Sequence, residues 1–196
     1  MRALNLIRLT GVTVFVFVCT AAQFLRADLR WMHAPLSFYL IGPGGAFVRG
    51  AYYLLSASLV AIGIGFLRGL APAARSAAPA LLFAIAGAAL TVTAASENVD
   101  ASADIAGVHT FVHQVAAMTT FLCVTVAMLV QSWRLRDDPR WRRRFAFAFG
   151  LACAAFVALW IYAVVPGLPR GLAQKTVIAL IVWWLGWASL ALARGR

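Results

Sequence analysis

Two histidines and three acidic residues lie close together in residues 96–113, SENVDASADIAGVHTFVH. His109 and His113 are spaced i, i+4, so on a helix both imidazoles point to one face, about one turn apart. Two imidazoles so arranged can share a metal ion such as zinc, with a third ligand from His33 or an acidic side chain. The HxxxH pattern has low specificity by itself, and this stretch lacks the glutamate of the HExxH motif. The acidic candidates here are Glu97, Asp100 and Asp104.

The same two histidines also have a structural interpretation. His109 can lie among lipid headgroups, while His113 can face neighbouring helices and bond to a serine, a threonine or a backbone carbonyl. Ionisable residues within membrane spans are nonetheless functional candidates by default. Of the pair, His113 is the stronger candidate because it lies deeper in its apolar run.

A second stretch of interest is residues 31–45, WMHAPLSFYLIGPGG. It is too polar and interrupted to continue a span, yet too aromatic for a free loop, so we expect it to lie along the membrane interface and to turn at its glycines. Ser37 can cap a short helix, satisfy a turn or act as a nucleophile; the absence of an assignable base favours the cap or turn. The site hypothesis therefore names as catalytic candidates Ser37, Asp100 and Asp104, and as metal ligands His33, His109 and His113.

The composition decides what must position these residues. Of 196 residues, 63% are hydrophobic and 12% charged, and the mean hydropathy is +0.87, which excludes an ordinary soluble domain. The net charge of +11 does not indicate nucleic-acid binding, because the basic residues fall between long apolar runs. Membrane lipids are the expected partners, and no protein partner is identifiable. The three cysteines show no CxxC spacing, so we expect no disulfide framework.

The chain offers six apolar runs of the length that a membrane-spanning helix needs, about 20 residues. The first lacks a clear cleavage pattern, so we expect a retained helix rather than a signal peptide. Pro- and Gly-containing breaks separate several of the runs. We therefore predict an all-α protein with one domain over residues 1–196, a compact bundle of six transmembrane helices near residues 8–25, 47–67, 77–95, 106–131, 145–165 and 174–193.

Charge distribution predicts the orientation of this bundle. If the N-terminus is cytoplasmic, most of the 17 basic residues fall on the inner side, led by RLRDDPRWRRR at residues 134–144. Both termini are then cytoplasmic, and the histidines and candidate acidic residues lie on the outer side. We expect Arg49 and Lys175 to snorkel to headgroups or to pair with Asp100 or Asp104.

The order of these features resembles the bacterial membrane-protein family known as domain of unknown function 998. The resemblance rests on PLSFYLIGPGGAFVRGAYYLL, GVHTFVHQVAA, RLRDDPRWRRR and GLPRGLAQKTVIALIVWWLGWASLAL, and it covers nearly the whole chain. It implies a six-helix bundle in a bacterial inner membrane, without an established activity. By this likeness Ser37, Gly42, Pro43 and His113 match recurring positions of the family, whereas SENVDASADIAG departs from its Pro- and Asp-containing loop.

Two functional hypotheses remain open. In the first, the protein is not an enzyme, and its outer polar cluster is structural or binds a lipid headgroup or a partner. In the second, it is a metal-dependent hydrolase of outer-leaflet lipids with a metal-bound water as nucleophile; a looser chemical similarity to alkaline-ceramidase-like membrane hydrolases suggests it. The hydrolase requires the three imidazoles within about 4–5 Å of each other. Bis-histidine haem is disfavoured because two histidines share a helix, and a transporter because no inverted repeat is evident.

Overall fold

The computed structural model describes residues 2–96 and 103–194, and within them all regular secondary structure is helical. Six α-helices are long and apolar enough to cross a membrane, as the sequence predicts. They are α1 (Arg2–Leu25), α2 (Gly45–Gly69), α3 (Ala77–Ala95), α4 (Ala103–Leu135), α5 (Phe145–Val164) and α6 (Arg170–Arg194). Three short 3-10 helices lie between them: η1 (Leu36–Leu40), η2 (Pro72–Ala74) and η3 (Arg142–Arg144).

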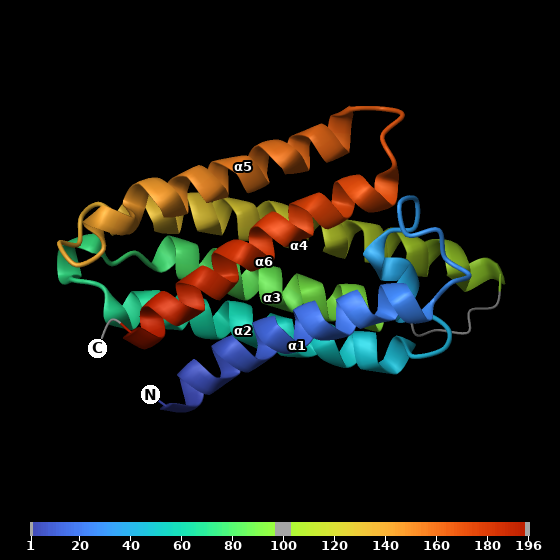
Figure 1. The fold of residues 1–196 in the computed structure, drawn as a ribbon, viewed down its shortest axis with the longest axis horizontal. Coiled ribbons are helices and arrows are strands. Elements are labelled where there is room, and N and C mark those ends of the chain that lie inside the picture. The colour runs from blue at the N-terminus through green and yellow to red at the C-terminus, as the bar shows by residue number, and fades with distance from the viewer. Residues whose placement is uncertain (1, 97–102, 195–196) are drawn as a thin grey trace.

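The helices run alternately up and down and form one bundle (Figure 1). Along the chain each helix packs against the next, and α6 returns to pack against α1 and α2. Both chain ends lie at the same end of the bundle (Figure 1). We call this the arginine end, since it carries residues 134–144, and the opposite one the histidine end, since it carries residues 26–44, His109 and His113.

Helices α1, α2, α4 and α6 extend beyond the spans expected from hydropathy. Helix α4 has 33 residues, about 50 Å at 1.5 Å per residue, against a hydrocarbon layer of about 30 Å. It continues through the polar sequence QSWRL, residues 131–135, because helix propensity there is good even though hydropathy falls. Helix α6 begins at Arg170, directly after Pro169, which cannot lie inside a helix without loss of a hydrogen bond.

Small residues allow α1, α2 and α3 to approach closely. A Cβ atom on Gly11 of α1 would lie 2.0 Å from Ser58 Oγ and 2.4 Å from the Leu54 carbonyl oxygen of α2. A Cβ atom on Gly87 of α3 would lie 2.8 Å from the Ser56 carbonyl oxygen. In lipid the hydrophobic effect does not drive helices together, so the association of helices depends on close van der Waals packing of this kind.

A buried carboxylate joins two connections at the arginine end. Asp138, whose side chain is 0% exposed, accepts hydrogen bonds from the backbone N–H groups of Ala71 at 2.8 Å and Arg140 at 2.9 Å. The Arg140 guanidinium approaches the same carboxylate at 3.3 Å and donates to the Gly69 carbonyl at 2.8 Å. The connection between α4 and α5 is thereby held against the end of α2.

Candidate site: an interhelical cavity at the histidine end

The segment that carries Ser37 folds into the end of the bundle. Leu36, Tyr39 and Leu40 of η1 are buried, with Leu40 0% exposed. Other apolar side chains of the stretch, Trp31, Met32, Phe38 and Ile41, are exposed. The segment therefore has one face in the core, and the expectation that it lies along the membrane interface stays a prediction. The expected turn at the glycines is confirmed, because Gly42 and Gly44 have φ values of 80° and 77°. Ser37 is not the cap of this helix, since Pro35 occupies that position and makes no side-chain cap bond.

Helix α6 fixes the segment through its first two turns. The side-chain oxygen Oε1 of Gln174 accepts a buried hydrogen bond of 2.8 Å from the backbone N–H of Leu36. The N–H of Leu172 donates to the Met32 carbonyl at 2.8 Å. Gly171 allows this approach, because a Cβ atom there would lie 2.5 Å from the Ala34 carbonyl oxygen.

Three cations bind carbonyl groups of the same segment. Arg26 donates to the Ile41 carbonyl at 2.6 Å, Arg49 to the Leu40 carbonyl at 2.6 Å, and Lys175 to the Trp31 carbonyl at 2.5 Å. The Lys175 ammonium also lies over the rings of Trp31 and Tyr39, 5.8 Å and 5.3 Å from their centroids. The sequence prediction placed Arg49 and Lys175 at headgroups or acidic partners; among the described residues, their hydrogen bonds go to backbone carbonyls.

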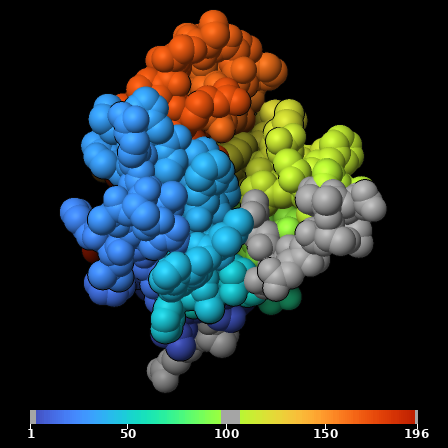
Figure 2. All heavy atoms as spheres, turned by 90° about the vertical axis from the view of Figure 1, so that its right-hand side faces the viewer, coloured from blue at the N-terminus to red at the C-terminus, as the bar shows by residue number. Residues whose placement is uncertain are grey.

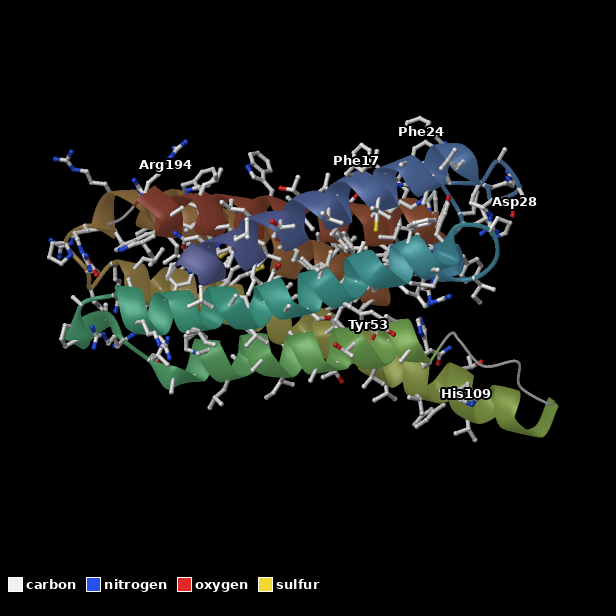
Figure 3. The ribbon with its side chains drawn as sticks, turned by 90° about the horizontal axis from the view of Figure 1, so that it is seen from below. Phe17, Phe24, Asp28, Tyr53, His109 and Arg194 are labelled. Carbon is white, nitrogen blue, oxygen red and sulfur yellow. The ribbon has the colours of Figure 1, made fainter. Side chains whose placement is uncertain are left out.

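Asp28 belongs to a local ion pair. Both of its carboxylate oxygens accept hydrogen bonds from Arg26, at 2.8 Å and 2.7 Å. This hydrogen bonding to the guanidinium lowers the pKa of Asp28 below its ordinary value, although its side chain is 60% exposed. Figure 3 places Asp28 and His109 at the same end of the bundle but on opposite sides.

His113 bonds to the end of α3. Its Nδ1 atom lies 3.0 Å from the Thr93 carbonyl oxygen and 3.3 Å from Ser96 Oγ. A carbonyl oxygen can only accept, so the geometry assigns a proton to Nδ1, and in the neutral ring Nε2 then carries the lone pair. The expectation that His113 bonds to a serine or a backbone carbonyl of another helix is confirmed. The ring is thereby held in one orientation at the boundary of α3 and α4.

The remaining candidates of the sequence analysis lie apart from one another. His33 is exposed in a turn in which its N–H donates to the Arg30 carbonyl. His109 is partly exposed on the part of α4 that projects beyond the other helices (Figure 3). Glu97 and Asp100 lie outside the described residues, and for Asp104 the structure describes only the backbone, in the first turn of α4.

The donor set does not fit a metal within the part of the chain that the structure describes. There, no three His, Cys, Asp or Glu side chains are grouped closely enough to hold an ion, so His33, His109 and His113 do not form a three-histidine centre. The two-histidine alternative with a third ligand from Glu97, Asp100 or Asp104 stays a prediction.

Ser37 and His113 instead line one cavity between the helices. Its volume is about 70 Å³. Polar groups gather at its histidine end, where η1, α3, α4 and α6 supply Ser37, Thr93, His113 and Gln174, and most of the remaining wall is apolar. The lining residues are Phe15, Ser37, Tyr52, Leu55, Leu59, Leu90, Thr93, His113, Ala117, Thr120, Phe121, Val124, Gln174, Ile178, Ile181, Val182 and Leu185.

Comparison with known proteins identifies the family of the chain. The family model described as protein of unknown function (DUF998) matches residues 9–191. The chain belongs to the DUF998 family. Neither a curated protein nor a solved structure matches it. The family description assigns no activity, so we infer the function of this DUF998 protein from the residues that line the cavity.

Thr93 and Gln174 are polar members of the cavity wall that sequence reasoning missed. A single glutamine four residues into α6, Gln174, has no motif, and Thr93 lies near the end of a largely apolar run. Their roles depend on tertiary partners, Leu36 and His113, which no local spacing reveals. For both residues, the indication that the sequence offered was a polar side chain about one turn inside an apolar span.

Proposed function

We propose that this DUF998 protein is a multi-pass protein of a bacterial inner membrane that binds an amphipathic lipid in the interhelical cavity. The observation that carries the proposal is the shared wall of Ser37 and His113, which come from distant segments and border one largely apolar space. Small-molecule sites have this character: mostly apolar lining, with a few polar groups that orient the ligand.

The distribution of polarity along the cavity suggests how the ligand is oriented. Ser37, Thr93, His113 and Gln174 supply hydroxyl, imidazole and amide groups at the histidine end, where a glycerol, ester or amide group of a lipid can bond. Deeper, Leu55, Leu59, Leu90 and Leu185 are among the residues that surround the space. At about 70 Å³ the cavity admits a short apolar segment of the lipid rather than a whole acyl chain. Such a segment suits this part better than water, which needs two to four polar partners.

Filling the cavity also contributes binding free energy. An empty cavity costs a protein about 24 cal/mol per Å³, so 70 Å³ corresponds to about 1.7 kcal/mol. This is roughly a fifteen- to twentyfold gain in affinity for a ligand that fills it. Desolvated hydrogen bonds to the polar end add selectivity for one class of headgroup.

The positive-inside rule supports an orientation with the arginine end in the cytoplasm. The arginine end carries Arg134, Arg136, Arg140 and the exposed residues Arg142–Arg144. The polar end of the cavity then lies at the depth of the outer leaflet, and the bound lipid comes from that leaflet.

Native mass spectrometry of detergent-purified protein tests the proposal. Wild type should retain about one lipid per chain after delipidation and re-addition of a total bacterial lipid extract. Ala117→Leu places three more carbons in the cavity wall and should lower retention at least about tenfold. Ala95→Leu, on an exposed position of α3, is the matched control and should retain lipid as wild type does.

Two results would count against lipid binding in the cavity. One is equal retention by Ala117→Leu and the control; the other is no retained lipid in wild type. The same spectra distinguish the hydrolase hypothesis, because turnover would release a lipid lacking one chain, whereas binding alone leaves its mass unchanged.

A further inference from the structure

A wide apolar groove lies between α1 and α6 on the surface of the bundle. Its volume is about 840 Å³, which is within the range of about 300–1,000 Å³ that is usual for ligand sites. Along it the side chains of Phe17, Phe24 and Trp183 are 72%, 83% and 60% exposed. The lining residues are Val12, Thr13, Val16, Phe17, Thr20, Ala21, Phe24, Val182, Trp183, Gly186, Trp187 and Leu190.

The groove follows from the spacing of large and small residues on the two helices. The lining residues of α1 recur at intervals of three or four, which places them on one face, and those of α6 do the same. Gly186 of α6 faces α1, since a Cβ atom there would lie 3.9 Å from Val12 Cγ1. The missing side chain deepens the groove between bulkier neighbours. Figure 1 shows α6 (red) beside α1 (blue).

The length of the groove matches one leaflet of a bilayer. At 1.5 Å per residue, the α1 wall from Val12 to Phe24 is about 18 Å long, and the α6 wall from Val182 to Leu190 about 12 Å. Half of a hydrocarbon layer of about 30 Å is about 15 Å. The groove therefore has the length that an extended acyl chain needs. Its α6 wall lies in the half of that helix nearer the arginine end.

Arg194 lies just beyond the α6 wall, at the arginine end. It follows Leu190 by four residues and so continues the same helix face by one turn, about 5.4 Å. Its side chain is exposed and has no carboxylate partner among the described residues. Figure 3 shows Phe17, Phe24 and Arg194 on one face of the bundle. A guanidinium one turn beyond an apolar wall is placed to bind the phosphate of a lipid.

The surroundings of Arg194 favour a negatively charged headgroup. Of the carboxylates that the structure describes at this end, Asp138 has a side chain that is 0% exposed, and Asp137 lies 3.6 Å from each of two other arginines. A second exposed arginine lies close to the groove. Trp187 packs against Trp141 with ring centroids 6.4 Å apart, and the Arg144 guanidinium lies over the Trp141 ring at 5.5 Å.

At the histidine end of the groove, the first cation after Phe24 along the chain is already engaged. Arg26 donates to both carboxylate oxygens of Asp28 and to the Ile41 carbonyl. Figure 2, which faces this end, shows the connection after α1 (blue) extending between the connection into α6 (orange) and the start of α2 (cyan). The charge pattern therefore places a headgroup at the arginine end of the groove.

From these observations we infer that the α1–α6 groove binds one acyl chain of an anionic phospholipid whose phosphate lies beside Arg194. With the arginine end in the cytoplasm, as proposed above, this lipid belongs to the inner leaflet. The site is separate from the interhelical cavity and goes beyond the function proposed for it. A second copy of the chain is disfavoured as the occupant, because a two-fold axis along the membrane normal would bring both Arg194 side chains to one depth of the same interface.

Native mass spectrometry with two defined probes tests the headgroup. The probes are dioleoyl-phosphatidylglycerol, which is anionic, and dioleoyl-phosphatidylcholine, which is zwitterionic, titrated into delipidated protein in the same detergent. Wild type should bind phosphatidylglycerol about fivefold more tightly. Arg194→Gln should bring the ratio of the two affinities to within about twofold of unity. Arg136→Gln, which removes the same charge directly after α4 and outside the groove, is the control and should keep the wild-type ratio.

A second pair of variants tests the groove itself. Gly186→Leu places a side chain in it and should weaken binding of both probes about tenfold. Gly150→Leu is the matched control, because a Cβ atom there meets open space on α5, and it should bind as wild type does. Ala117→Leu, which fills the interhelical cavity, should leave the affinity for phosphatidylglycerol within twofold.

Three results would overturn the inference. One is equal affinity of wild type for the two probes, and another is equal binding by Gly186→Leu and Gly150→Leu. The third is a wild-type dimer that Gly186→Leu converts to monomers, because it would assign the groove to a second copy. If Ala117→Leu weakened binding and Gly186→Leu did not, the probe would occupy the cavity; the groove inference would fail while the proposed function stood.

Discussion

Replacing Asp138 by asparagine should destabilise the protein far more than the same change at Asp137. The Asp138 side chain is 0% exposed and accepts from two backbone N–H groups, those of Ala71 and Arg140. Asp137 is 36% exposed, and its oxygens approach Arg134 and Arg136 only to 3.6 Å. The two variants remove the same charge from adjacent positions. The difference between their free energies of unfolding therefore isolates the contribution of the buried hydrogen bonds.

The expected magnitude follows from the partners of the carboxylate. A hydrogen bond to a charged group contributes about 1.5–3 kcal/mol, and asparagine keeps one acceptor oxygen but turns an N–H donor towards the other N–H group. The Arg140 side chain is 59% exposed, so its ion pair contributes less than about 1 kcal/mol. Asp138→Asn should therefore cost about 3 kcal/mol, more than a hundredfold in the folding equilibrium, and Asp137→Asn less than about 1 kcal/mol.

The assay is reversible unfolding in lipid bicelles, followed by circular dichroism, over a range of pH. Burial alone would raise the pKa of Asp138, but the hydrogen bonds from Ala71 and Arg140 outweigh it and hold the pKa below its usual value near 3.9. Because the folded pKa is depressed, this stabilisation is present above the unfolded pKa and is lost as the pH falls through the folded pKa. The difference in unfolding free energy between wild type and Asp138→Asn should thus be constant from pH 5 to 7 and shrink below about pH 4. Equal losses of unfolding free energy in the two variants would refute the reasoning. So would a difference between wild type and Asp138→Asn that does not change as the pH falls.

Further predictions concern the helix contacts and the segment that closes the cavity. Gly11→Ala should destabilise the protein by more than about 2 kcal/mol in the same unfolding assay, because its Cβ would lie 2.0 Å from Ser58 Oγ. Gly150→Ala is the control: a Cβ atom there meets open space, so the variant should be neutral or stabilising by up to about 1 kcal/mol. Similar changes in the free energy of unfolding for the two variants would contradict the close approach of α1 and α2. Gln174→Leu removes the acceptor of the buried Leu36 N–H, so amide exchange over residues 34–40 should accelerate at least about tenfold; unchanged exchange in deuterium-labelling mass spectrometry would show that α6 does not hold the segment.

How much was predictable depends on the range of the interaction concerned. Span length and hydropathy are local properties, so the six helices were predictable, including α3 at Ala77–Ala95. The bond from His113 to the end of α3 was also expected, since a polar group within a span needs a partner. Burial of η1 was not, because an aromatic residue such as Tyr39 suits an interface as well as a core. The carbonyl partners of Arg49 and Lys175 were missed because a sequence displays no backbone acceptors.

The site shows the same division. Ser37 and His113 were singled out by residue type, but their shared cavity depends on how η1 enters between the helices. The three histidines are not grouped among the described residues, because His33 lies in a turn of the segment before η1 and the other two on α4. Residue chemistry thus indicated candidates, whereas the fold decided which of them line one cavity.

The most direct test of lipid binding in the cavity is an experimental structure of the protein in lipid nanodiscs. We predict lipid density in the cavity between α2, α3, α4 and α6 that ends within hydrogen-bonding distance of His113 or Ser37. A cavity that holds only ordered water, or that is closed by repacked side chains, would contradict the account.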